Sequence, residues 1–321
     1  MTQPRVFWYD RQDRDRQWFR MLLSCRHSVI PDIMPRVLIC VVFGWMVSLL
    51  HARGWPLSLP ILGTVVPSIV LGLLLVFRTN TAYERFWEGR KQWGALVNVV
   101  RNLARTVWVT VDESDPEDRA GKMAAVKLLP AFAIATKVHL RHESPEDSEL
   151  AALLTPAQYQ KLQTMNSPPL EIAFWVGDYL QSQYERKCID AFQLTSLFER
   201  LDVMVDVLGA CERILKTPIP LAYSIHLKQM ISLYCLMLPF QIVAPLQGWT
   251  APVTGLISFA ILGIEAIGIE IENPFGRDPN DLPLDDICRT MVRNIDDLIT
   301  LTPCTHHDGG LVPGEISRVT S

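Results

Sequence analysis

The stretch LSLPILGTVVPSIVLGLLLVFRTNTAYERFW, from Leu57 to Trp87, decides the fold of this 321-residue chain. Its first part, Leu57 to Phe77, carries no charged residue and is long enough to cross a hydrocarbon core of about 30 Å. Pro60 and Pro67 interrupt this part, but spans tolerate proline where neighbouring helices or water satisfy the freed carbonyl groups. The helical period then continues past Arg78 into polar sequence. This continuity predicts a helix that lines a pore rather than a simple anchor.

Two further apolar regions predict additional membrane spans. Residues 37–50 are apolar throughout, and the Gly54-Trp55-Pro56 turn joins them to the central stretch as a helical hairpin. Residues 229–264 contain no charge, and the turn at 245–249 divides them into spans at about 220–244 and 251–270. We therefore expect four transmembrane helices in each subunit.

The charges around these spans predict their orientation. Seven arginines precede the first apolar run, namely Arg5, Arg11, Arg14, Arg16, Arg20, Arg26 and Arg36. Positive charge collects on the cytoplasmic side, so the N-terminus is expected there. Four spans return the C-terminus to the same side, which predicts a multi-pass protein with both termini cytoplasmic.

Between the two pairs of spans the apolar residues recur every three or four positions, as in amphipathic helices. Helices are expected at about 78–111, 119–140, from 156, 169–183, 190–215 and 287–301, and the charged segment 141–149 is interpreted as a loop. No useful strand alternation occurs, so the predicted fold class is all-α. The expected organisation is 1–30 as an N-terminal cytoplasmic or interfacial segment, 31–78 as the first transmembrane hairpin, 79–218 as a large cytoplasmic helical region, 219–272 as the second hairpin and 273–321 as a cytoplasmic C-terminal segment.

Composition narrows the class of protein. A formal net charge of −4, without a basic stripe, argues against nucleic-acid binding. The seven cysteines form no C-x-x-C pair and are interpreted as reduced structural residues. No nucleophile motif and no glycine-rich phosphate loop occur, so we expect neither an enzyme nor a cofactor.

Several ionisable residues deserve a functional and a structural interpretation. His139, His142 and Glu143 offer metal ligands, but a zinc site needs three or four convergent ligands, so histidines at a helix end are the better interpretation. Within the last two spans, ionisable side chains usually face a bundle interior or a wet cavity. These residues are His226, Lys228, Glu265 and Glu270, and the two interpretations are comparable for them.

Two separated motifs carry a family resemblance. GLLLVFRTNTAYERFWEGRKQW (Gly72 to Trp93) and IENPFGRDPNDLPLDD (Ile271 to Asp286) resemble the two signatures of the bestrophin family, particularly its bacterial members. The matching motif residues are Arg78, Asn80, Asn273, Pro274, Phe275 and Gly276. The resemblance covers most of the chain.

This resemblance implies a passive channel for small monovalent ions, mainly chloride. It implies a homopentamer surrounded by lipid in the bacterial inner membrane. A cation-selective channel of the same fold and a non-conducting membrane sensor or scaffold are the alternatives. These three functions differ in whether the purified protein alone carries ions and in whether those ions are anions or cations.

The resemblance also assigns roles to residues. Val65, Ile69 and Leu73 share one helical face, with Ser68 and Gly72 beside them, and match the hydrophobic neck of the family's pore. Hydrophobic constrictions of this kind gate by losing water. A second, cytoplasmic aperture is expected near Phe192.

In animal members of the family the segment after Asn-Pro-Phe-Gly forms a calcium clasp rich in consecutive acids. Here Asp278, Asn280 and Asp281 offer oxygen ligands, but Arg277 and Pro279 disrupt the acidic run. A fixed positive charge beside the ligands repels calcium. A structural turn is therefore expected in preference to a metal site.

Overall fold

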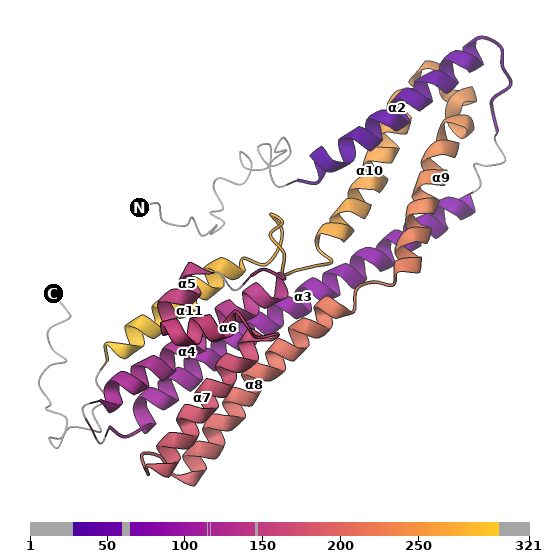
Figure 1. The fold of residues 1–321 in the computed structure, drawn as a ribbon. Coiled ribbons are helices and arrows are strands. Elements are labelled where there is room, and N and C mark those ends of the chain that lie inside the picture. The colour runs from indigo at the N-terminus through magenta and orange to yellow at the C-terminus, as the bar shows by residue number, and fades with distance from the viewer. Residues whose placement is uncertain (1–27, 60–64, 114, 116, 145–146, 302–321) are drawn as a thin grey trace, which may run out of the picture. The chain divides into compact units, whose positions relative to one another are not determined.

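The computed structural model describes residues 28–59, 65–113, 115, 117–144 and 147–301. The regular structure of these residues is helical throughout (Figure 1). The α-helices are α2 (Ile30–Ala52), α3 (Val65–Thr110), α4 (Asp118–Leu140), α5 (Ser148–Leu153), α6 (Pro156–Leu162), α7 (Pro168–Glu185), α8 (Ala191–Lys216), α9 (Leu221–Leu246), α10 (Thr250–Glu270) and α11 (Leu284–Ile299), with a 3₁₀ turn η3 at Gln247–Trp249.

The chain forms two compact units. The first unit consists of the chain up to Tyr83 together with Ile219–Glu272 and Asp278–Asn280. It therefore contains α2, the first turns of α3, and the whole of α9 and α10. The second unit contains Glu84–Pro218, Asn273–Arg277 and the chain from Asp281 onward. It therefore holds the rest of α3 together with α4 to α8 and α11.

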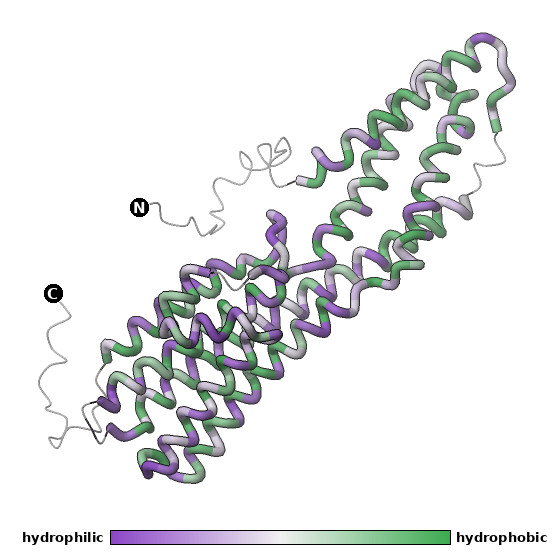
Figure 2. Tube along the Cα trace, viewed as in Figure 1, coloured by the Kyte–Doolittle hydropathy of each residue, from purple (hydrophilic) through white to green (hydrophobic). Residues whose placement is uncertain are grey.

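In the first unit, α2 packs along α10 and both contact α9. Glycines set the approach of α2 to α10, because a Cβ added at Gly255 would lie 2.6 Å from Val41 Cγ2, and one at Gly44 would lie 3.3 Å from the Ala251 Cα. Such small-residue contacts are typical of helix packing in membranes. Figure 2 shows hydrophobic colouring along most of α2, α9 and α10.

Three of the described segments are long and apolar enough to cross a membrane. They are Ile30–Ala52, Asp118–Leu140 and Leu221–Glu270, the last of which contains both α9 and α10. Most of Asp118–Leu140 is buried inside the second unit, as expected for a core helix. The first turns of α3 are not among the three, so the number of spans stays a prediction.

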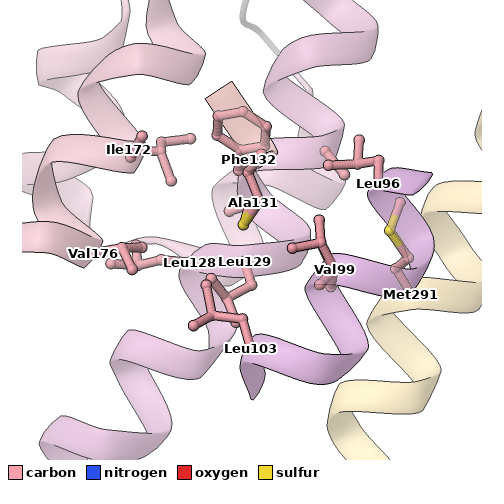
Figure 3. Packing of buried hydrophobic residues seen from close by; sticks show 14 of the residues in the cluster. Leu96, Val99, Leu103, Leu128, Leu129, Ala131, Phe132, Ile172, Val176 and Met291 are labelled. Carbon is pink, nitrogen blue, oxygen red and sulfur yellow. The ribbon is translucent and has the colours of Figure 1, made fainter. Parts of the chain in front are cut away.

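The second unit has its own hydrophobic core around α4. Phe132 of α4 is fully buried, and side chains of α3, α7 and α11 surround it (Figure 3). Charged groups are paired at the edge of this core. The ammonium group of Lys137, which is nearly buried, lies 2.9 Å from Asp285 and 3.2 Å from Asp147, and Arg141 lies 3.1 Å from Asp285.

The helices differ from the sequence predictions at two places. The central stretch was expected to be helical from Leu57, but 57–59 are not helical, and the Leu59 N–H instead donates to the Phe240 carbonyl at 3.0 Å. The segment expected as a loop at 141–149 runs into the short helix α5, which Asp147 caps by accepting from two backbone N–H groups. Most other helices lie within a few residues of their predicted positions.

Candidate functional site

One face of α3 is exposed along the apolar half of the helix. Leu71, Leu75, Arg78 and Ala82 recur at helical spacing and are buried. The opposite side carries Ile69, Leu73, Val76 and Asn80, which we call the exposed stripe; the three apolar members are 53%, 52% and 53% exposed. The helix thus packs against its own unit along one side and exposes a row of apolar side chains on the opposite side.

The structure places most of the predicted neck on this side of α3. Ile69 and Leu73 belong to the exposed stripe, and Ser68 and Gly72 are exposed beside it. A Cβ added at Gly72 would meet nothing within 4 Å, so open space lies there within the subunit. Val65 is the first residue of α3, and its side chain lies outside the described part of the chain.

The polar residues after Phe77 continue the helix because their side chains bond to its own backbone. The hydroxyl of Thr79 donates to the Leu75 carbonyl and that of Thr81 to the Phe77 carbonyl, each at 2.9 Å. These bonds satisfy polar groups locally. The exposed stripe therefore changes from apolar to polar at Asn80 without a break in the helix.

Arg78 fixes the rotation of α3 at this change. Its side chain is 3% exposed, and the guanidinium donates to Ser224 Oγ at 2.9 Å and to Glu272 Oε2 at 3.0 Å. The other oxygen of Glu272 accepts from the Ile219 N–H at 3.0 Å. One ion pair thus joins α3 to the start of α9 and the residues after α10. Glu272 and Ser224 were missed in the sequence, because 194 and 146 residues separate them from Arg78.

The second family motif forms a packed turn in the second unit. Pro274 and Phe275 are buried against Gly89 of α3, where an added Cβ would lie 3.0 Å from the proline ring. Asn273 is exposed, and a Cβ at Gly276 would lie 2.6 Å from an oxygen of Asp281. The close approach at both glycines explains why larger residues do not fit there.

Arg277 beside this turn is held by Glu143, with contacts of 2.6 and 2.9 Å. The hydrogen bond from Arg277 lowers the pKa of Glu143. Asn280 donates to Glu270 at 2.9 Å, in the first unit. In the described residues no group of three or more His, Cys, Asp or Glu side chains is placed to hold a metal ion. Asp278, Asn280 and Asp281 are therefore not gathered with further ligands into such a cluster.

The other candidate residues from the sequence analysis lie in different surroundings. His139 lies 2.8 Å from Glu212, while His142 lies beyond the end of α4 and is exposed. Phe192 is 89% exposed on the first turn of α8. Glu265 is buried, with Arg36 at 3.9 Å, and lines a cavity of about 420 Å³ in the first unit. His226 and Lys228 are exposed on α9.

Comparisons with known proteins agree with the two motifs. Residues 9–297 match the family described as bacterial/fungal bestrophin proteins. A voltage-dependent anion channel-forming protein of Nostoc sp. is 60% identical over 306 residues, covering 95% of this chain and 98% of the relative. Another protein of that description, from Escherichia coli, is 34% identical over 278 residues, covering 85% and 89%.

Solved structures show the same fold. A bacterial bestrophin homologue from Klebsiella pneumoniae, carrying one substitution, superposes with a TM-score of 0.77 at 28% identity, covering 84% of this chain and 99% of the other. With a match over most of its length and relatives of high identity, the chain belongs to the bacterial and fungal bestrophin family.

Proposed function

We propose that this chain is the subunit of a channel through which small monovalent anions, chloride foremost, pass without any reaction. The observation that carries the proposal is the exposed stripe of α3. Ile69, Leu73 and Val76 face away from their own unit and lead directly into polar residues of the same helix. The names of the relatives as anion channel-forming proteins support the sign of the permeant ion.

The exposed stripe differs from other apolar surfaces of the first unit. α2 also exposes Leu38, Ile39 and Val42, but α2 ends at Ala52 without a polar continuation of that line. A surface that contacts lipid only needs to be apolar. A surface that contacts permeating ions and water has to pass from a narrow apolar section to a polar one, as α3 does at Asn80.

The assembly that follows is a homopentamer in the bacterial inner membrane, with four spans per subunit and both termini cytoplasmic. Five copies of α3 around one axis would bring the exposed stripes together as rings. Residues 31–78 and 219–272 would form the two transmembrane hairpins, and 79–218 the cytoplasmic region. Such rings of apolar side chains gate by excluding water.

Ion flux through liposomes that contain only the purified protein tests this function. Chloride efflux that depends on the protein is the expected result. Potassium flux without chloride flux would favour a cation channel of the same fold. Protein that inserts and assembles but carries neither ion would contradict the channel and favour a membrane scaffold.

The neck has a test of its own. Trimming Val65, Ile69 and Leu73 together to alanine removes methyl groups from each ring, so we expect a wider, wetter constriction and a higher single-channel conductance. Ion preference should change little, because no charge is altered. Trimming Leu38, Ile39 and Val42 on α2 is the matched control, with no effect expected on conductance. An intact mutant oligomer with unchanged or lower conductance would rule out this neck.

A further inference from the structure

A basic row runs along α3 in the second unit. Arg90, Arg101 and Arg105 are separated by 11 and 4 residues, which places them on one face of the helix, and all three are exposed. Residues 89–110 include no Asp or Glu. Arg101 and Arg105 also repel one another, because like charges four residues apart on a helix are unfavourable.

An acidic row of the opposite sign runs along α8. Glu199, Asp202 and Asp206 lie at positions i, i+3 and i+7, on one face, and all three are exposed. The two rows belong to the same compact unit. In the described part of the chain no ion pair joins them.

This lack of pairing contrasts with several other charges of the second unit. Lys137, Arg141 and Arg277 each lie within 3.2 Å of a carboxylate of their own unit. Among the described residues, no ion pair is formed by Arg101, by Arg105 or by the acidic row. Two unpaired rows of opposite sign are complementary surfaces for a second copy of the chain.

The register of the two helices brings part of the two rows to the same level. Arg85 of α3 donates to the carbonyl groups of Ile214 in α8 and of Thr217 just after it. Glu88, further along α3, interacts electrostatically with Cys211 and Arg213, further back along α8, so the helices run antiparallel side by side. Arg101 lies sixteen residues beyond Arg85, and sixteen residues back from these two carbonyls are Phe198 and Leu201. Arg101 is thus level with Glu199, which is beside Phe198, and close to the level of Asp202.

We propose that Arg101 and Arg105 of one subunit form ion pairs with Glu199 and Asp202 of the neighbouring subunit. The inference rests on the assembly part of the proposed function. Rotation about an axis roughly parallel to α3 and α8 carries a copy sideways without changing its level. The α8 of a neighbour therefore presents Glu199 and Asp202 at the level of Arg101, with Arg105 about one turn further along α3.

A second feature of the sequence fits this pairing. Nearer the start of α3 the exposed charge is Glu84, and the exposed charges at the matching end of α8 are Arg213 and Lys216. The sign therefore reverses on both helices together.

A charge exchange tests the proposal through the oligomeric state, measured by light scattering and native mass spectrometry of the detergent-solubilised full chain. R101E/R105E alone and E199R/D202R alone are each expected to raise the fraction of free subunits about tenfold. The variant that combines all four changes should restore the wild-type oligomer. K161E on α6, an exposed lysine outside both rows, is the control and should leave assembly unchanged.

Three results would overturn the inference. The first is normal assembly of both one-sided variants at 50 mM and at 500 mM salt. The second is a combined variant that dissociates as much as its parents. The third is normal assembly of R101E/R105E with ion selectivity shifted toward cations, which would mean that these arginines face permeating ions. Because assembly is measured without flux, a wild-type oligomer that carries no ions would contradict the channel function and leave this interface standing.

Discussion

The two units of this protein differ in how far they bury apolar side chains and pair charges. The second unit surrounds Phe132 with a core of its own and pairs many of its charges, as Lys137 and Arg141 do with Asp285. The first unit has a smaller buried cluster and, in the described residues, the ion pairs Arg36–Glu265 and Arg78–Glu272. It also exposes large apolar side chains along α2, α3, α9 and α10.

This difference shows which environment each unit requires. A buried apolar core stabilises a unit whose surface faces water. A unit that leaves its apolar side chains exposed needs lipid or further copies around them. Mutations should therefore cost most where the second unit is packed and least where the first unit faces outward.

The largest effect is expected from Phe132→Ala in α4. The ring is fully buried, so its removal leaves a cavity and should lower the free energy of unfolding by about 4 kcal/mol. Val42→Ala in α2, where the side chain is 63% exposed, is the matched change in the first unit and should cost less than about 1 kcal/mol. Chemical denaturation in detergent measures both. Equal costs would contradict the contrast between the units.

Arg78→Ala should have the next largest effect, and it falls in the first unit. The substitution leaves Glu272 without its cationic partner where α3, α9 and the end of α10 meet, at a cost of about 3 kcal/mol. We also expect altered conductance, because Arg78 sets the rotation of the exposed stripe. Arg78→Lys keeps the charge and loses one of the two hydrogen bonds, so an intermediate loss of thermal stability is expected. A melting temperature equal to that of wild type for Arg78→Ala would show that the Arg78–Glu272 ion pair is not needed for stability.

Gly255→Ala tests the packing of α10 on α2. The new methyl group would lie 2.6 Å from Val41 Cγ2, so the Val41 side chain or the helices must shift, at a cost of about 2 kcal/mol. Gly121→Ala in α4 is the control, because an added Cβ there meets nothing within 4 Å. That change should stabilise the protein by about 0.5 kcal/mol. The melting temperature is expected to fall for Gly255→Ala and to rise for Gly121→Ala. A shift of both melting temperatures in the same direction would argue against a tight contact between Gly255 and Val41.

The smallest effect is expected from Asp285→Asn. Burial alone would raise the pKa of Asp285, but hydrogen bonds from Lys137 and Arg141 lower it overall. A carboxyl group with a lowered folded-state pKa stabilises the protein above its unfolded-state pKa, and this contribution is lost as the pH falls through the folded value. The carboxylate is 46% exposed and solvent screens it, so we expect a loss of about 1 kcal/mol at pH 7.

The same variant should flatten the acid limb of the stability curve below about pH 4. Unfolding at pH 7 and at pH 3 measures this, with Asp286→Asn as the neighbouring control. Asp286 pairs with Arg289 within α11 and both are exposed. If the free energy of unfolding differs between wild type and Asp285→Asn by the same amount at pH 7 and at pH 3, titration of Asp285 does not contribute to the pH dependence of stability.

Local patterns in the sequence predicted most of the helices. The charge-free run around Gln247 becomes α9, η3 and α10, and α6 begins at Pro156 as expected, with Thr155 as its cap. α5 escaped prediction because it has only six residues, and a short helix depends on contacts such as the burial of Leu150. Its one local signal was Asp147 as a helix cap.

The site was predictable in part for a related reason. The helical spacing of Ile69 and Leu73 is local, so the sequence alone placed them on one face. The partners of Arg78 are far away in the chain, and no local pattern identifies Ser224 or Glu272. The levels of the charged rows on α3 and α8 likewise required the contact of Arg85 with α8.

The packing of α2 against α10 has a consequence for biosynthesis. About 200 residues separate the two helices, and ribosomes add roughly 5–20 residues per second. After α2 enters the bilayer, it therefore waits on the order of 10–40 s for the glycine-lined surface that receives it. During this time most of the second unit has already been translated. The first of the described helices to be made is among the last to find its partner, so an insertase or chaperone that shields α2 would act in that interval.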